Sequence, residues 1–209
     1  MRFQKLSLKR AFDVAAASAA LVVLSPVMLA TAVGVKVLLR RPVIFRQTRY
    51  GLNTVPFEIF KFPSYRLLYD ENGALLPEAD RITHFGRFLR LSKLDEVPQF
   101  YNVLKGDMSI VGPRPRTDLN TVPIGALRYE VLPGMTGPTQ VAKLPIPAAV
   151  ANKLNADYVE GRRKRGALAR DFVLLVRTPF AVLINNIERR YDYATPRVRP
   201  RVPHAPVMP

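Results

Sequence analysis

The chain of 209 residues contains no cysteine and only two histidines, His84 and His204. The absence of cysteine excludes disulfide bonds, thiol nucleophiles and cysteine-ligated metal sites. Two histidines are too few for a histidine-rich metal centre, so any bound metal would have oxygen ligands and would be Mg²⁺ or Mn²⁺. The length corresponds to one ordinary domain, with room for an appendage, that can bury a hydrophobic core.

Acidic residues are scarce too: 16 Asp and Glu stand against 32 Lys and Arg, which gives a formal net charge of +16. Such a balance predicts anionic partners, namely nucleic acid, an anionic membrane surface or phosphorylated substrates. A nucleic-acid binder would carry a basic stripe with stacking aromatic residues. The basic residues here gather instead around an apolar segment, a candidate site and the C-terminal tail. We therefore expect no nucleic-acid partner and favour anionic membrane lipid and phosphorylated substrates.

Charge is absent altogether from Val14 to Val35, a run of 22 residues. As one straight helix the run would be about 33 Å long, enough to cross a hydrocarbon core of about 30 Å. Basic residues follow the run where a cleavable signal peptide would have a small-residue cleavage site. We therefore predict a retained membrane segment.

Ser25 and Pro26 lie near the middle of this segment. Proline kinks a helix and would leave two halves of about 15–18 Å, each too short to span a bilayer alone. A hairpin that enters and leaves one leaflet would satisfy the basic flanks at both ends, and the Ser25 hydroxyl could cover a backbone group freed by the bend. The alternative is a kinked spanning helix, which the residues alone slightly favour because such helices are common.

The pattern of the whole chain predicts an α+β fold, mainly α. We divide it into a membrane helix at 1–40, a domain at 41–190 that carries the candidate site, and an unstructured tail rich in Pro and Arg at 191–209. The elements expected in the domain are a β-hairpin within 40–64, an acidic mobile loop at 69–80, helices at 81–91, 94–104 and 152–164, irregular loops at 111–147, and an apolar helix pair at 168–187 interrupted at Pro179. The helix pair could belong to the core or lie along the membrane interface.

Two adjacent carboxylates, Asp95 and Glu96, carry the clearest chemical signal. Pro98 is tolerated only in the first turn of a helix, so the pair lies at a helix N-terminus, where the backbone favours phosphate. Arg90 precedes the pair, and Arg114 follows it in a Gly-Pro-Arg-Pro turn. This set predicts attack on a phosphate by a nucleophile or metal ligand, with cations for the developing charge. A simple helix cap at Asp95 is the plain alternative, but it explains neither Glu96 nor the arginines.

Residues 93–115, KLDEVPQFYNVLKGDMSIVGPRP, closely resemble the central motif of the small monotopic phosphoglycosyl transferases, the bacterial sugar transferase family. The resemblance extends over most of 8–178. Its other parts are LKRAFDVAAASAALVVLSP at 8–26, VIFRQTRYG at 43–51, FEIFKF at 57–62, LPGMTGPTQV at 132–141 and ARDFVLLVRT at 169–178.

The resemblance implies a re-entrant N-terminal helix, broken at Ser25-Pro26, with both ends in the cytoplasm. The catalytic domain would then lie on the cytoplasmic face of a bacterial inner membrane. The family reaction moves a sugar-1-phosphate from a UDP-sugar to a polyprenyl phosphate, releases UMP and requires Mg²⁺. It is the first membrane step of polysaccharide or glycoconjugate synthesis.

The resemblance also implies roles for single residues. Asp95 would be the nucleophile that forms an acyl-phosphate intermediate, and Glu96 would coordinate metal, assist as a base, or do both. Both carboxylates are therefore candidate Mg²⁺ ligands. Lys61, Arg90 and Arg114 are candidates for phosphate contacts, and Asp157, within a family-like Asp-Tyr-Val segment, is a weaker active-site candidate.

The chain departs from the family pattern in two places. Residues 61–65 read KFPSY where Lys-Phe-Arg-Ser-Met is common, and residues 140–143 read QVAK where a Gln-Val-Asn-Gly-Arg ending is usual. These losses concern sugar or nucleotide contacts, because the carboxylate pair and the arginine turn are intact. Two alternatives remain open: a non-catalytic membrane scaffold of the same fold, and an ordinary glycosyltransferase that releases UDP.

Overall fold

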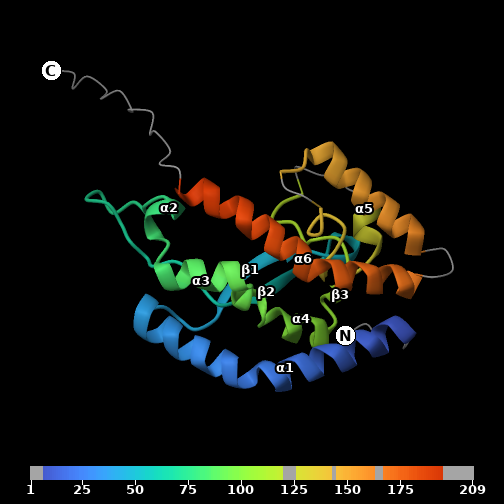
Figure 1. Ribbon diagram of the computed structural model, residues 1–209, viewed down its shortest axis with the longest axis horizontal. Coiled ribbons are helices and arrows are strands. Elements are labelled where there is room, and N and C mark those ends of the chain that lie inside the picture. The colour runs from blue at the N-terminus through green and yellow to red at the C-terminus, as the bar shows by residue number, and fades with distance from the viewer. Residues whose placement is uncertain (1–6, 120–125, 143–144, 163–166, 195–209) are drawn as a thin grey trace.

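The computed structural model describes residues 7–119, 126–142, 145–162 and 167–194. Within them the fold is α+β and mainly helical, as predicted. The helix α1 (Leu8–Gly34) runs along one side of the molecule, and it bows away from the other elements in its middle (Figure 1). His204 lies outside the described residues.

The membrane segment forms one continuous helix. A π-helical turn, η1 (Val35–Leu39), extends α1. The combined helix, Leu8–Leu39, has 32 residues and is, by length and composition, able to cross a membrane. Pro26 lies inside α1 and cannot donate to the carbonyl of Val22 four residues earlier. The Ser25 hydroxyl donates to that same carbonyl at 2.7 Å. The hydrogen bond predicted for the Ser25 hydroxyl is thus present, and the helix continues through Pro26.

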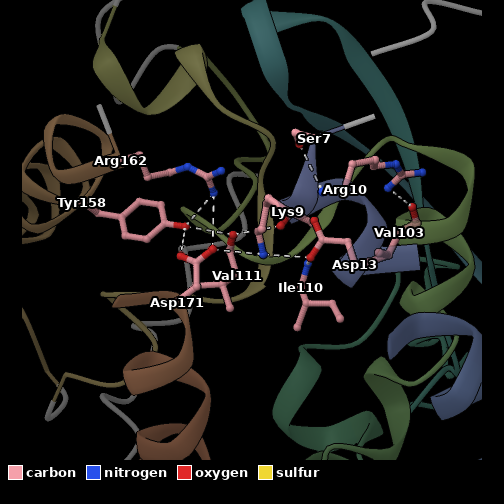
Figure 2. Close-up of polar contacts among 11 residues, drawn as sticks. Ser7, Lys9, Arg10, Asp13, Val103, Ile110, Val111, Tyr158, Arg162 and Asp171 are labelled. Carbon is pink, nitrogen blue, oxygen red and sulfur yellow. Dashed lines mark hydrogen bonds and ion pairs between the residues drawn. The ribbon is translucent and has the colours of Figure 1, made fainter. Parts of the chain in front are cut away.

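Both ends of α1 are fixed to the same globular body. Near the start, Lys9 pairs with Asp13 at 2.8 Å and with Asp171 of α6 (Ala167–Ala194) at 3.1 Å (Figure 2). Arg10 donates to two backbone carbonyls at the end of α4 (Gln99–Lys105). At the far end, the buried Val35 and Leu39 belong to a core cluster with Phe62 and Leu89. The exposed middle therefore lies between two anchored ends.

The predicted hairpin is confirmed as β1 (Phe45–Tyr50) paired antiparallel with β2 (Pro56–Lys61). A short 3₁₀ turn, η2 (Leu52–Thr54), connects the strands, and Asn53 takes the left-handed conformation at φ 53°. The buried Asn102 of α4 accepts from the Phe60 backbone N–H and donates to the Glu58 carbonyl. The hairpin is thereby tied to the helix that follows the carboxylate pair.

The helix expected at 81–91 begins later than predicted. A short helix, α2 (Glu78–Arg81), ends before it, and α3 (His84–Ser92) starts after Thr83, whose hydroxyl accepts from the Gly86 N–H. The left-handed Lys93, at φ 61°, ends α3 and leads into a 3₁₀ turn, η3 (Leu94–Glu96). The helix predicted at 94–104 is confirmed as η3 followed by α4, which ends at Gly106 with φ 95°.

The segment predicted as irregular at 111–147 contains regular structure. A parallel pair joins β3 (Ser109–Val111) to β4 (Gly134–Thr136), and a 3₁₀ turn, η4 (Leu127–Glu130), lies between them in sequence. The backbones pack so closely that a Cβ at Gly134 would lie 2.0 Å from the Gly112 nitrogen. Strands of three residues are too short to show an alternating pattern, which explains why the prediction missed them.

The C-terminal helices also differ from the prediction. The first, α5 (Ala148–Arg162), begins four residues earlier than expected. The expected helix pair is a single helix, α6, that continues through Pro179, so the prediction of an interruption there was wrong. Because α6 runs to Ala194, the first part of the predicted tail is helical, and residues 195–209 lie outside the described structure. Side chains of β2, β3, α4, α5 and α1 meet in the larger core cluster.

Candidate active site

The carboxylate pair lies in the η3 turn, where three elements meet. The backbone N–H of Phe62, just after β2, donates to the Asp95 carbonyl at 3.0 Å. The Glu96 N–H donates to the Lys93 carbonyl, which closes the turn. Lys61, the last residue of β2, is thereby placed beside the pair. Lys61 and the carboxylate pair, which are more than 30 residues apart in the sequence, are thus brought together as predicted.

Glu96 is held by two cations. Its Oε1 accepts from Arg114 at 3.0 Å and from Lys61 at 3.4 Å. Burial alone would raise the pKa of Glu96, but Arg114 and Lys61 outweigh it and lower the pKa to about 2. Glu96 is therefore an anion at neutral pH whose charge is already matched.

Asp95 lies in a contrasting environment. It is 9% exposed, and its Oδ1 has no hydrogen-bond partner among the described residues. Burial, followed by the neighbouring negative charge of Glu96, raises the pKa of Asp95 to about 6, although Lys61 opposes the shift. A buried carboxylate oxygen without a partner among the described residues is a candidate for bonding to a phosphorus atom or a metal ion.

The pair opens into a cavity of about 620 Å³, which we call the dyad cavity. Its charged end is formed by the carboxylate pair and nearby cations. Its other wall is largely apolar and includes residues of α6. The lining residues are Lys61, Arg90, Lys93, Asp95, Glu96, Phe100, Ile110, Arg114, Met135, Thr136, Thr139, Gln140, Ile146, Leu175, Thr178, Val182 and Asn185. The cavity can thus accommodate a charged group at one end and an apolar group at the other.

Arg90 lines the dyad cavity but is held in place by other groups. Its Nε donates to the Ser64 hydroxyl at 3.0 Å, and its Nη2 lies 2.6 Å from Glu78. Its guanidinium lies 4.2 Å from the centre of the Tyr65 ring, a cation–π distance. The segment that departs from the family pattern therefore supplies two of the groups that orient Arg90.

Asp157 is not brought to the carboxylate pair. It is exposed on α5 and lines a separate cavity of about 390 Å³ with Tyr158 and Arg170. Of the second departure, Gln140 lines the dyad cavity, and Lys143 lies outside the described residues. The structure therefore groups Asp95, Glu96, Lys61, Arg90 and Arg114 and leaves Asp157 apart.

The sequence analysis assigned no role to several cations that the fold brings close. Lys93 directly precedes the pair and lines the dyad cavity. Arg49, Arg116 and Arg128 line a second cavity that adjoins Arg114. Lys93 could have been found from its place in the quoted motif. Arg128 could not, because it comes from η4, a segment with no recognisable periodicity.

The donor set is compatible with Mg²⁺ but not with a metal cage made by the protein alone. Among the described residues there is no group of three or more His, Asp or Glu side chains that could hold a metal ion. Mg²⁺ is usually bound by one or two carboxylates together with water and substrate phosphates. The adjacent Asp95 and Glu96, with the unpartnered Oδ1 of Asp95, supply that minimal set.

Comparisons with known proteins identify the family of the chain. Residues 4–185 match the family described as Bacterial sugar transferase. The chain is 43% identical over 144 residues to UDP-glucose:undecaprenyl-phosphate glucose-1-phosphate transferase of Escherichia coli (strain K12), which covers 64% of this chain and 31% of the relative. It is also 42% identical over 142 residues to UDP-N-acetylgalactosamine-undecaprenyl-phosphate N-acetylgalactosaminephosphotransferase of Aeromonas hydrophila, covering 64% of this chain and 34% of the relative.

These relatives are longer proteins, and the matches span about a third of their length. A relative of more similar size is the sugar transferase EpsL of Bacillus subtilis (strain 168), which is 43% identical over 138 residues, or 64% of this chain and 68% of the relative. The family match covers most of the chain, including α1 and the carboxylate pair. This protein belongs to the bacterial sugar transferase family.

Proposed function

We propose that the protein transfers a sugar-1-phosphate from a UDP-sugar to a polyprenyl phosphate through a covalent intermediate on Asp95. The observation that carries the proposal is a contrast within the dyad cavity. A buried Asp95 oxygen has no hydrogen-bond partner among the described residues, whereas the neighbouring Glu96 carboxylate is paired with Arg114 and Lys61. The names of two relatives describe transfer of a sugar phosphate from a UDP-sugar to undecaprenyl phosphate.

In the first step, a carboxylate oxygen of Asp95 attacks the sugar-bearing phosphorus of the donor. The bond from that phosphorus to the bridging oxygen breaks, and its electron pair leaves with UMP. The product on the protein is an acyl phosphate that carries the sugar. Because Asp95 accepts no hydrogen bond at Oδ1, it need not break one to react.

In the second step, a phosphate oxygen of the polyprenyl phosphate attacks the same phosphorus. The acyl–phosphate bond breaks, the Asp95 carboxylate is restored, and a polyprenyl-diphosphate sugar leaves. Arg114 and Lys61 lie where negative charge collects in both steps and would stabilise it. The apolar wall from α6, with Leu175 and Val182, suits the lipid end of the acceptor.

Mg²⁺ belongs to this proposal as a bound cofactor. Asp95 and Glu96 would hold the ion together with donor phosphate oxygens. When bound, it offsets the repulsion between a carboxylate nucleophile and an anionic phosphate. The residues of the chain itself orient the phosphates, since Arg114 and Lys61 are fixed by Glu96 on the same side of the cavity.

We also propose that α1 is re-entrant and that the catalytic domain lies on the cytoplasmic face of a bacterial inner membrane. A spanning helix would separate its ends by a bilayer, whereas here Arg10 contacts α4 and Leu39 packs in a cluster with Leu89 of α3. The middle of α1 exposes Val22 and Val23 at 74% and 73%. The exposed apolar residues and the basic flanks together suit one leaflet of an anionic membrane.

Nucleotide release tests the proposed reaction. The purified protein, in lipid nanodiscs, would be given a panel of UDP-sugars with Mg²⁺ and a polyprenyl phosphate, and UMP and UDP would be quantified separately. We expect UMP with a particular sugar donor, in an amount matched by the lipid-linked sugar. Release of UDP would replace the proposal with ordinary glycosyl transfer. Release of neither nucleotide across the panel would favour the non-catalytic scaffold.

A further inference from the structure

A second cavity, of about 460 Å³, adjoins the dyad cavity and shares Arg114 and Thr139 with it. We call it the arginine cavity, because four arginines line it: Arg49, Arg114, Arg116 and Arg128. None of its lining residues, all of them within the described ranges, is Asp or Glu. The arginine cavity therefore collects positive charge without an acidic side chain in its own wall.

The arrangement is electrostatically costly without a ligand. Burial lowers the pKa of Arg49, and the nearby charges of Arg114 and Arg116 lower it further, although Glu96 opposes the shift. Burial and Arg116 also lower the pKa of Arg128, although Tyr129 opposes them. Like charges that share a partly desolvated cavity repel one another, and a bound anion removes that repulsion.

Two buried polar atoms also lack partners here. The Nε of Arg49 has no hydrogen-bond partner among the described residues, although Gln47 Oε1, at 2.7 Å, and the Pro115 carbonyl hold the rest of its guanidinium. The Oδ1 of Asn155, whose residue is 2% exposed, has none either. Buried polar atoms are normally paired, so an unpaired donor and an unpaired acceptor on residues that line one cavity point to a polar ligand.

We propose that the arginine cavity binds the nucleotide part of the donor. This inference rests on the proposed function and assigns the two ends of its substrate. The sugar-bearing phosphate lies at Asp95, the second phosphate lies across Arg114 in the arginine cavity, and the uracil ring extends toward Asn155. Arg114 belongs to both cavities, so one side chain contacts both phosphates of a single diphosphate.

The placement gives the arginines a role in the first step. When the bond to the bridging oxygen breaks, the departing phosphate of UMP gains negative charge. That charge develops next to Arg49, Arg116 and Arg128, which stabilise the leaving group. At the other end, the Oδ1 of Asn155 accepts the ring N–H of uracil and its Nδ2 donates to the adjacent uracil carbonyl. Cytosine has an acceptor nitrogen and an amino donor at these two positions, so the same cavity selects the base.

Direct binding of UMP tests the subsite without any chemistry. Full-length protein in nanodiscs is titrated calorimetrically with UMP and with CMP. We expect Arg49→Gln to weaken UMP binding by about tenfold or more, because a charge-assisted contact is lost. The matched control is Arg46→Gln on the same strand, whose side chain is 64% exposed and pairs with Glu58; it should bind UMP as the unmodified protein does.

Asn155→Asp separates base recognition from charge. Both nucleotides carry the same phosphate, so added repulsion weakens them equally and leaves their ratio unchanged. An aspartate cannot donate to the uracil carbonyl but can accept from the amino group of cytosine, so we expect the preference for UMP over CMP to disappear or reverse. An unchanged preference would overturn the assignment of Asn155.

The subsite and the proposed function can fail separately. UMP binding that is absent, or equal in Arg49→Gln and in the unmodified protein, overturns the subsite even if UDP-sugars are turned over. UMP binding that depends on Arg49, in a protein that releases no UMP from any donor, supports the subsite and contradicts the reaction. If Arg49→Gln does not fold, Arg49→Lys replaces it; loss of the planar fork should weaken UMP binding several-fold, and no change would count against the proposal.

Discussion

Two buried charge clusters in this protein use the same residue types in opposite ways. In the first, which joins α1 to α6, Lys9 lies between Asp13 and Asp171, and Arg162 and the Tyr158 hydroxyl also contact Asp171 (Figure 2). In the second, Glu96 is paired with two cations while the Asp95 Oδ1 beside it has no partner. Asp171 Oδ2, like Asp95 Oδ1, accepts no hydrogen bond among the described residues, but Lys9 and Arg162 lie 3.1 Å and 3.6 Å from it. We therefore call the first cluster closed, because cations match its carboxylates, and the second open at the Asp95 Oδ1, for which the described residues supply neither a hydrogen bond nor an ion pair.

The difference teaches how to separate structural from reactive charges. A buried carboxylate whose oxygens are matched by cations and donors contributes to the fold and has little capacity left for a ligand. A buried carboxylate oxygen with neither a hydrogen bond nor an ion pair costs stability, which marks that atom as a candidate for a ligand or a reaction. On this basis Asp13 and Asp171 are structural, and Asp95 is reactive.

Replacing the open carboxylate should have the largest effect on activity. Asp95→Asn keeps the shape of the side chain but removes the nucleophile, so we expect UMP release to fall by roughly 10⁴-fold or more. The measurement is turnover with the donor identified in the nucleotide panel. The control is Glu58→Gln, whose exposed side chain pairs with Arg46 on the hairpin surface. Substantial turnover by the Asp95→Asn variant would exclude Asp95 as the nucleophile.

Breaking the closed cluster should instead affect stability. Lys9→Met leaves Asp13 and Asp171 buried without their common cation, and we expect a loss of about 3–5 kcal/mol in the free energy of unfolding. Denaturant unfolding in detergent measures it. The control, Lys105→Met, removes a cation that is 47% exposed in its pair with Asp107, and should change stability by less than about 1 kcal/mol. Equal effects of the two substitutions would contradict the distinction.

The open carboxylate should also reveal itself in the pH dependence of stability. Burial and the charge of Glu96 raise the pKa of Asp95 from an ordinary 3.8 to about 6 in the folded protein, so the folded state holds this proton more tightly. Ionisation of Asp95 therefore lowers the free energy of unfolding. This destabilisation is absent below pH 4, where the group is protonated in both states, and it reaches its full value of at most about 3 kcal/mol above pH 6. Asp95→Asn removes this cost.

Thermal unfolding in EDTA, scanned from pH 4 to pH 8, checks that sign. The melting temperature of Asp95→Asn should exceed that of the unmodified protein at pH 8, and the difference should shrink as the pH falls toward 4. EDTA is needed because a bound cation would offset the same charge. A variant that is less stable at pH 8 would mean that Asp95 has a stabilising partner after all.

The sequence predicted the parts of the fold that have strong local signals. The hairpin followed from β-forming residues around Gly51, the start of α4 from Pro98 and its end from Gly106. The carboxylate pair, Lys61 and Arg114 were identified from a single motif and its resemblance, and the structure brings them together. These features depend on nearby residues, which is why one sequence is enough to predict them.

The features that were missed depend on tertiary contacts. Nothing local distinguishes Arg49 in β1 or Arg128 in η4 from surface cations, yet both reach the arginine cavity. The parallel pair of β3 and β4 is stabilised by close backbone packing between distant glycines. Pro179 looked like a helix end, but α6 continues through it. Local propensity is a weak guide where packing decides the outcome.

The smallest expected effect on stability concerns a backbone carbonyl in α1 that accepts a hydrogen bond from a serine side chain. The Ser25 hydroxyl donates to the Val22 carbonyl, which lacks a backbone donor because residue 26 is proline. Ser25→Ala should lower the free energy of unfolding by about 0.5–1 kcal/mol, in the range of such bonds within membranes. Ser18→Ala, at another exposed serine of α1, is the control.

In a Pro26→Ala background the backbone N–H of residue 26 can again donate to the Val22 carbonyl, so Ser25→Ala should then leave the free energy of unfolding unchanged. If the cost of Ser25→Ala is the same in both backgrounds, the hydroxyl acts elsewhere, since only the freed carbonyl links it to the proline.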